Sequence, residues 1–139
     1  MKPSIKAGIA VGAATGAWMF GEYAIGLHDG PGGGAGRWTG FLALAFPVSG
    51  AWWLVRNAGL SSWREATREG LLFGAVGGLV SAAAIYFYFT VTNPDFRLEG
   101  ARVDAGAQAL TGFGGALILG AVLVALMYGF SAGRGNRRG

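Results

Sequence analysis

An uncharged, mostly apolar stretch of 23 residues runs from Gly70 to Thr92. At 1.5 Å per residue this stretch would form a helix about 34 Å long, enough to cross a hydrocarbon layer of about 30 Å. A charged segment, 62–69, precedes it, and Ser62 and Glu65 have the spacing of a capping box. Asn93 and Pro94 follow it and should end the helix. We therefore predict a membrane span over ~70–92, with a surface helix start over ~62–69.

The composition of the whole chain agrees with a membrane protein. Hydrophobic residues make up 53% of the sequence and charged residues only 13%, against a usual charged share of about 25%. A chain of 139 residues is short enough for one domain. It has no cysteine and one histidine, which excludes disulfides, thiolate metal sites, iron–sulfur clusters and zinc sites built on paired histidines.

Three further apolar runs predict spans over ~5–27, ~38–56 and ~106–130, followed by a basic tail over 131–139. The first run has the basic start of a signal peptide. It lacks a convincing cleavage site and stays apolar past Glu22, so we interpret it as an uncleaved helix. Pro47 should kink the second span, because its ring removes a backbone hydrogen bond. The predicted fold class is all-α, a single bundle of four transmembrane helices.

The basic residues predict the orientation of this bundle. With four spans, both termini and the connection between the second and third spans share one side, which holds most of the cations. The positive-inside rule places that side in the cytoplasm. A tail that binds RNA or anionic lipid is the alternative; we interpret it as a topology anchor and expect no nucleic-acid partner. The cations on the two sides are Lys2, Lys6, Arg56, Arg64, Arg68, Arg134, Arg137 and Arg138 against Arg37, Arg97 and Arg102.

Small residues recur at every fourth position in three of the four predicted spans. Such residues share one helix face, where the missing side chains let two backbones approach closely. Chance is the alternative, since the chain has 27 glycines. We expect these faces to pack helix against helix. They consist of Gly8, Gly12 and Gly16, then Gly70, Gly74 and Gly78, and then Gly112, Ala116 and Gly120.

Two polar residues near the end of the first span are candidates for chemistry. Glu22 is an ionisable residue within an apolar run, where a carboxylate is costly and often functional. It could handle protons or ions, or it could pair with His28 or Arg37 in a structural role. His28 could ligate a haem or pigment through one ring nitrogen, or hydrogen-bond at the surface. The sequence predicts no cofactor or metal site, and leaves contact with a pigment or lipid open.

Two other clusters have simpler interpretations. The glycines of 30–34 lack the Lys-Ser/Thr of a phosphate-binding loop and follow no strand, so we predict no nucleotide site. The acids Asp95, Glu99 and Asp104 could bind a divalent cation weakly, but two arginines lie among them. We predict a solvated connection there.

Several blocks of the sequence resemble a family of small bacterial four-helix membrane proteins known only as a domain of unknown function. The resemblance extends from the first span to just beyond the third, and it implies a four-helix fold in the bacterial inner membrane. It implies no activity. The blocks are Glu22–His28, Trp38–Leu42 with Pro47, Trp63–Ala66 leading to Gly70, Ile85–Phe89 and Asn93–Phe96.

We expect a non-catalytic protein, since no nucleophile and base are arranged as a catalytic set and the spans offer few polar groups. The preferred function is an accessory or structural subunit of a larger membrane assembly, in contact with the bilayer and with other membrane subunits. A respiratory or photosynthetic complex is compatible with the sequence. The alternative is a small carrier or sensor in which Glu22 and His28 titrate as a pair; an integral-membrane enzyme is the third.

Overall fold

The computed structural model describes residues 1–29, 34–98 and 100–135. The central residues of the glycine loop (30–33), Glu99 and the last residues of the basic tail (136–139) lie outside the described part. So do the side chains of Arg37 and Arg134, which leaves the predicted pairing of Arg37 with Glu22 and the anchoring role of Arg134 without a structural account.

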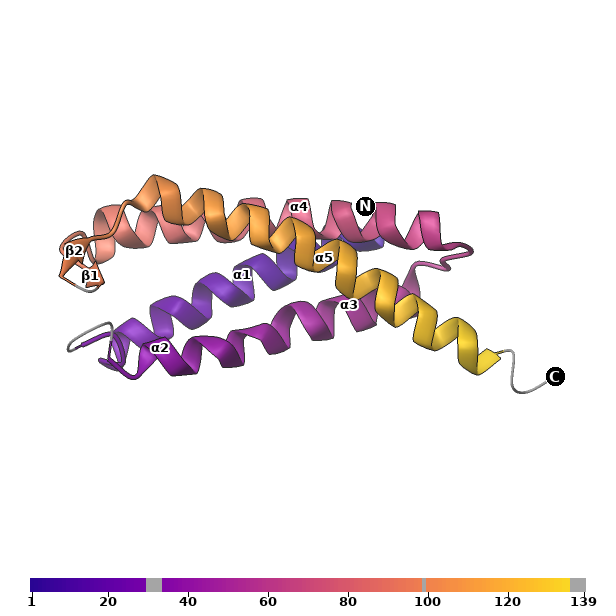
Figure 1. Cartoon of the computed structure of the whole chain (residues 1–139), viewed down its shortest axis with the longest axis horizontal. Helices are drawn as coiled ribbons and strands as arrows, with labels where there is room; N and C mark the ends of the chain where they lie inside the picture. Colours follow the sequence, from indigo (N-terminus) through magenta and orange to yellow (C-terminus); the bar gives the residue numbers. More distant parts are fainter. Residues whose placement is uncertain (30–33, 99, 136–139) are drawn as a thin grey trace.

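The chain forms an elongated bundle of helices (Figure 1). Two of them, Trp63–Thr92 and Ala105–Ala132, are long and apolar enough to cross a membrane. α1 begins and α5 ends toward the same end of the bundle, called here the basic end because Arg56, Arg64 and Arg68 also lie there; the other end is called the opposite end. The elements are α1 (Pro3–Ala24), α2 (Gly36–Thr39), the 3₁₀ helix η2 (Gly40–Leu44), α3 (Ala45–Asn57), α4 (Trp63–Phe87), the π-helical turn η3 (Tyr88–Thr92), β1 (Arg97–Leu98), β2 (Ala101–Arg102) and α5 (Ala105–Gly135).

The second apolar run is divided rather than simply kinked. Pro47 lies in the first turn of α3, and the residues before it form the 3₁₀ helix η2. Proline lacks the N–H that would bond to the carbonyl of Ala43, and its ring crowds that carbonyl. The tighter 3₁₀ winding accommodates both effects. The predicted irregularity therefore lies on the N-terminal side of the proline.

One glycine-lined contact joins α1 to α4. A Cβ atom added at Gly12 would lie 2.6 Å from the carbonyl oxygen of Gly77 and 2.7 Å from the Cβ of Val80. Gly8 and Gly16 meet the same helix one turn before and after, at Phe73 and Ala84. Such distances are too short for any side chain. The α1 ladder thus packs backbone to backbone against α4.

The second glycine-lined contact joins α4 to α5 on another face of α4. A Cβ at Gly74 would lie 2.5 Å from the carbonyl oxygen of Ala116, and one at Gly120 would lie 2.7 Å from that of Gly70. Gly78 meets Ala116 and the backbone of Phe113, and Gly112 meets the side chain of Ile85. α4 is therefore the central helix, with small residues turned toward two neighbours.

The apolar core lies in the half of the bundle near the basic end. Leu54 of α3, Ala66 and Phe73 of α4 and Val124 of α5 are buried there in one cluster. The Trp63 ring stands edge-on to Tyr128, with centroids 5.5 Å apart. These contacts bring α3, α4 and α5 together on one side, while a different set of contacts closes the opposite end.

The connections between helices end in side-chain caps. Ser62 accepts a hydrogen bond from the backbone N–H of Glu65 as predicted, but the Glu65 carboxylate bonds to the backbone N–H and hydroxyl of Ser61 instead of to Ser62. Asp104, predicted as a solvated loop acid, accepts from the N–H of Ala107 at 2.7 Å and caps α5. The connection before it is a two-stranded hairpin, in which Arg97 opposes Arg102.

Candidate functional site

A buried carboxylate lies at the opposite end of the bundle. Glu22 belongs to the last turn of α1 and is only 6% exposed. Its Oε1 accepts a hydrogen bond from the indole Nε1 of Trp18 at 2.8 Å and another from the hydroxyl of Thr39. Trp18 is one helical turn earlier on the same face, whereas Thr39 comes from α2. The carboxylate thus joins α1 to the segment that follows the glycine loop.

A turn after α1 brings the single histidine back to this carboxylate. Gly26 has a φ of 76°, a left-handed conformation that suits glycine, and the N–H of Leu27 bonds to the carbonyl of Glu22 at 2.9 Å. As a result, Nε2 of His28 lies 3.3 Å from Oε2 of Glu22. The other ring nitrogen, Nδ1, lies 2.5 Å from the hydroxyl of Tyr88.

Tyr88 links the pair to the end of the third predicted span. Its side chain is 1% exposed, and its ring is edge-on to those of Phe20, Tyr23 and His28. The π-helical turn η3 begins at Tyr88, and the N–H of Asn93 closes it on the Tyr88 carbonyl at 2.8 Å. This turn brings the Asn93 side chain back, so that its Nδ2 donates to the Tyr88 hydroxyl at 3.0 Å.

The hydrogen bonds of this network form a chain that runs from Asn93 through Tyr88 and His28 to Glu22. Asn93 donates to the Tyr88 oxygen, which leaves the Tyr88 O–H free to donate to Nδ1 of His28. A neutral imidazole that accepts at Nδ1 carries its proton on Nε2 and donates it to Glu22. Trp18 and Thr39 also donate to Glu22, so its carboxylate accepts three hydrogen bonds. Of the two neutral tautomers, the one protonated at Nε2 lets Tyr88 donate to His28 and lets His28 donate to Glu22.

Both ring nitrogens of His28 have hydrogen-bond partners in the chain itself. Ligation of a haem iron or of a pigment's metal would require one of these bonds to break. Among the described residues no group of three or more His, Cys, Asp or Glu side chains could hold a metal ion. Asp104 caps a helix, and Arg97 and Arg102 bond to backbone carbonyls, those of Gly100 and Pro94.

The predicted residues therefore separate into two groups. Glu22 and His28 lie together in the polar network, while the nine small residues lie in the helix contacts described above. Four members of the network were not foreseen: Trp18, Thr39, Tyr88 and Asn93. A Trp four residues before a Glu in an apolar run is a usable signal. Tyr88 gives none, because its sequence neighbours Tyr86 and Phe87 are exposed aromatic residues of the kind found at a membrane surface.

A groove runs along the outside of α1, beside the buried carboxylate. It has a volume of about 620 Å³ and is lined by small residues of α1 and larger apolar ones of η2 and α3. Unlike Gly12, Gly21 has no atom within 4 Å of the position a Cβ would take. This part of α1 offers a small-residue face that no helix covers in the described chain. The lining includes Ala14, Ala17, Trp18, Gly21, Leu42 and Phe46.

A charged contact fixes the start of α1 at the basic end. The hydroxyl of Ser4, fully buried, donates to Glu69 of α4 at 2.6 Å, and the ammonium of Lys2 lies 3.8 Å from the same carboxylate. Together with the network at the opposite end, it ties α1 to α4 at both ends of their glycine contact.

Comparison with known proteins identifies a family but no activity. A family model described as "Protein of unknown function (DUF4199)" matches residues 6–99. The match spans α1 through β1 and so includes every member of the Glu22 network. No curated protein and no solved structure matches the chain. The resemblance to a family of unknown function is confirmed.

Proposed function

Because the chain belongs to the DUF4199 family, which carries no assigned activity, we propose a function from the geometry: a non-catalytic, multi-pass membrane protein that serves as an accessory subunit of a larger membrane assembly. The observation that carries the proposal is the uncovered small-residue face of α1. Inside the chain, glycine ladders are places where one helix backbone meets another. Gly21, four residues after Ala17, gives α1 small residues on another face beside a groove, and a transmembrane helix of a partner is the natural occupant.

The proposed topology has four spans with both termini in the cytoplasm of a bacterial inner membrane. The two long apolar helices support two of the spans. α1 has 22 residues, about 33 Å at 1.5 Å per residue, and the run from Gly36 to Asn57 is of comparable length. Lys2, Lys6, Arg56, Arg64 and Arg68 at the basic end support its placement in the cytoplasm.

The buried network supports a structural role for Glu22 within such a subunit. An unpaired charge in the membrane would be costly, whereas this carboxylate accepts three hydrogen bonds from its own chain. The bonds come from α1, the turn after it and α2, and Tyr88 extends them to η3 at the end of α4. The network therefore fixes the two halves of the chain together at the end that lacks the apolar core.

A second candidate function rests on the continuity of the same network. Glu22, His28 and Tyr88 form an unbroken line of exchangeable protons, as a small carrier or sensor would require. The Glu22→Gln variant distinguishes the candidates, because the amide preserves shape but presents an N–H to the Nε2–H of His28. For either candidate we expect a less stable chain. An accessory subunit should still assemble, whereas a carrier or sensor should have lost a pH-dependent flux or signal.

The assembly itself is tested at Gly21. In the native host, Gly21→Leu should release the protein from its larger assembly, because the added side chain enters the groove from a position whose Cβ has no atom within 4 Å. Gly115→Leu is the matched control, since Gly115 on α5 also has nothing within 4 Å of its Cβ position. If both variants leave the native size unchanged, the groove is not the assembly face.

A further inference from the structure

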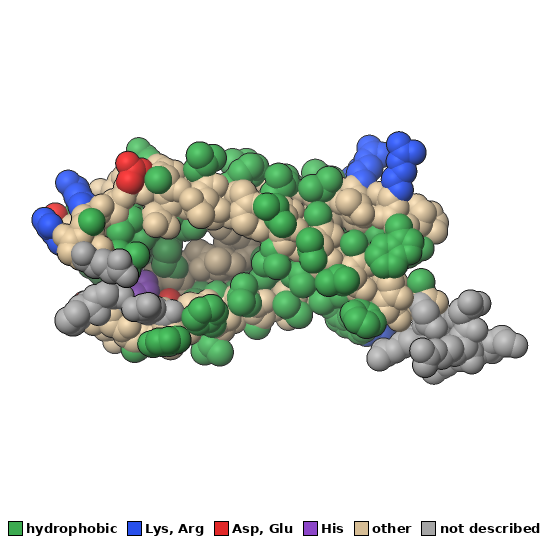
Figure 2. Space-filling view, in the orientation of Figure 1, with side chains coloured by type: hydrophobic (Ala, Val, Ile, Leu, Met, Phe, Trp, Pro, Cys, Tyr) green, Lys and Arg blue, Asp and Glu red, His purple; other side chains and the backbone are tan. Residues whose placement is uncertain are grey.

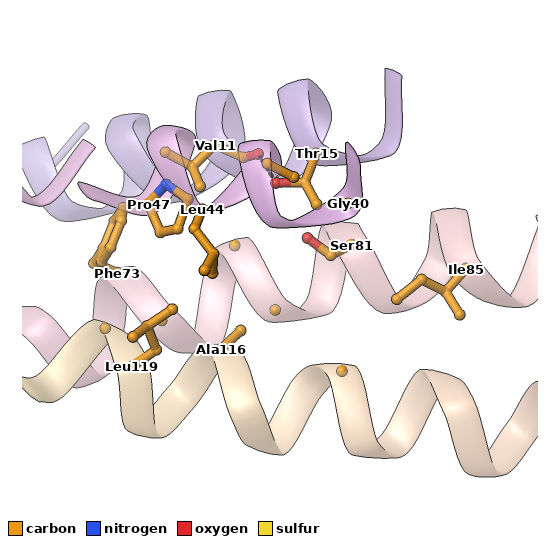
Figure 3. Close-up of a pocket in the computed structure, with 16 residues that line it drawn as sticks. Val11, Thr15, Gly40, Leu44, Pro47, Phe73, Ser81, Ile85, Ala116 and Leu119 are labelled. Atoms are coloured by element: carbon orange, nitrogen blue, oxygen red, sulfur yellow. Dashed lines mark hydrogen bonds between the residues drawn. The ribbon is translucent and has the colours of Figure 1, made fainter. Parts of the chain in front are cut away.

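A second cavity lies between the helices, midway along the bundle. It has a volume of about 280 Å³ and takes its walls from α1, η2, α3, α4 and α5. Figure 3 shows Thr15 of α1, Leu44 of η2 and Pro47 of α3 on one side, and Ser81, Ile85 and Leu119 on the α4 and α5 side. None of these residues belongs to the Glu22 network. The cavity is a separate feature of the fold.

The course of the helices explains why the cavity exists. η2 lies on α1, whereas α5 lies along α4 and crosses α3 toward the basic end. Away from that crossing, η2 and α5 do not close on one another. Figure 2 shows the resulting hollow between the α4–α5 pair and the layer of α1 and α3, in the half of the molecule toward the opposite end. The cavity is therefore reached from the side of the bundle.

The chemistry of the walls argues against water as the occupant. A buried water needs two to four polar partners, and the walls offer two hydroxyls, one of which is already bonded: Thr15 donates to the carbonyl of Val11 at 2.9 Å. If the cavity were empty, the atoms that line it would have no dispersion contacts on that side. An apolar molecule satisfies these walls better than either water or vacuum.

The size of the cavity decides between a helix and a thinner occupant. The cavity has a volume of about 280 Å³, less than half of the 620 Å³ of the groove beside Gly21 that we assign to a partner helix. A flexible chain of methylene groups fits, and the cavity opens sideways between two segments that we propose to lie within the bilayer.

We propose that this cavity binds one hydrocarbon chain of a membrane lipid, which enters between η2 and α5. The chain would pass Ile85 and Leu44 and lie against Ser81. The proposal goes beyond the accessory role, because it assigns a lipid to the interior of the subunit, whereas the Gly21 groove is assigned to a protein partner.

Photolabelling in a defined bilayer tests the proposal. The full chain is reconstituted in vesicles of phosphatidylethanolamine and phosphatidylglycerol that contain a phospholipid with a diazirine in its acyl chain. After irradiation, labelled positions are mapped by mass spectrometry. We expect adducts on cavity residues such as Ser81 and Ile85 as well as on the exposed side chains Leu110 and Ile118.

Two separate variants fill the cavity and keep the test decisive if one of them misfolds. Ser81→Leu extends into it from α4, and Gly40→Leu extends into it from η2, where an added Cβ meets nothing within 4 Å. Either should reduce the cavity adducts several-fold and leave those on Leu110 and Ile118 unchanged, while Gly115→Leu should change neither. Cavity residues that stay unlabelled, adducts that persist in both filled variants, or crosslinks to a second copy would each overturn the proposal.

Discussion

Replacing Tyr88 with Phe removes one oxygen from the buried network and leaves its packing in place. The ring of Tyr88, 1% exposed, contacts Phe20 and Tyr23, and Phe keeps those contacts without leaving a cavity. What is lost is the hydroxyl that donates to Nδ1 of His28 and accepts from Asn93. The change in stability therefore reports mainly on the hydrogen bonds of the Tyr88 hydroxyl, because the ring contacts are kept.

The size of the effect follows from what is left unpaired. The His28 side chain is 13% exposed, so its Nδ1 has little access to a replacement partner, and an orphaned buried acceptor costs about 1–3 kcal/mol. Asn93 is half-buried and can turn toward solvent, so it adds less. We expect Tyr88→Phe to lower the free energy of unfolding by about 1–3 kcal/mol.

The assay is reversible unfolding in mixed micelles, in which a harsh anionic detergent is titrated into a mild one and helicity is followed by circular dichroism. Tyr86→Phe is the matched control, because Tyr86 lies on the same helix, is 54% exposed and has no hydroxyl contact among the described residues. Its effect should stay within about 0.5 kcal/mol. Equal, small effects of the two substitutions would refute the reasoning that the network fastens this end of the bundle.

Three further outcomes are expected. Gly12→Ala should lower the free energy of unfolding by about 1–3 kcal/mol, because its Cβ would lie 2.6 Å from a backbone oxygen of α4. Gly114→Ala is the control and should not lower it, because a Cβ there has no atom within 4 Å. Equal losses for the two variants in the same titration would contradict a close-packed contact. ¹⁵N NMR of labelled histidine reports on His28 alone, and should show a neutral ring protonated at Nε2; protonation at Nδ1 would contradict the direction of the network. Asp104→Ala should cost about 1 kcal/mol by removing the α5 cap, while Asp95→Ala should be neutral in circular dichroism melts; the opposite order would show that Asp104 is only a loop acid.

The helix faces could be predicted from the sequence, but the pairing of those faces could not. A four-residue period identifies one side of a helix, which is why Gly8, Gly12 and Gly16 could be grouped. It carries no information about the partner helix. Gly77, which meets α1 at Gly8, falls outside the period of Gly70, Gly74 and Gly78. The sequence pattern therefore did not indicate that α4 has a second contact face.

The polar site was accessible only in its local part. Glu22 and His28 are six residues apart, and a glycine in the turn between them makes their approach foreseeable. Tyr88 lies 60 residues beyond His28, and nothing local separates a buried tyrosine from an exposed one in an aromatic run. The Asn93 side chain reaches the Tyr88 hydroxyl because of the π-helical turn η3. No residue pattern in the sequence indicated that turn.

The most direct test of the account is the native size of the unmodified protein. Solubilised from its own membranes in a mild detergent and separated by native electrophoresis, the chain should migrate with a stoichiometric membrane partner, at a mass well above that of its own 14.3 kDa. Recovery solely as a free single chain, folded and without a partner, would contradict the proposal that this protein is an accessory subunit.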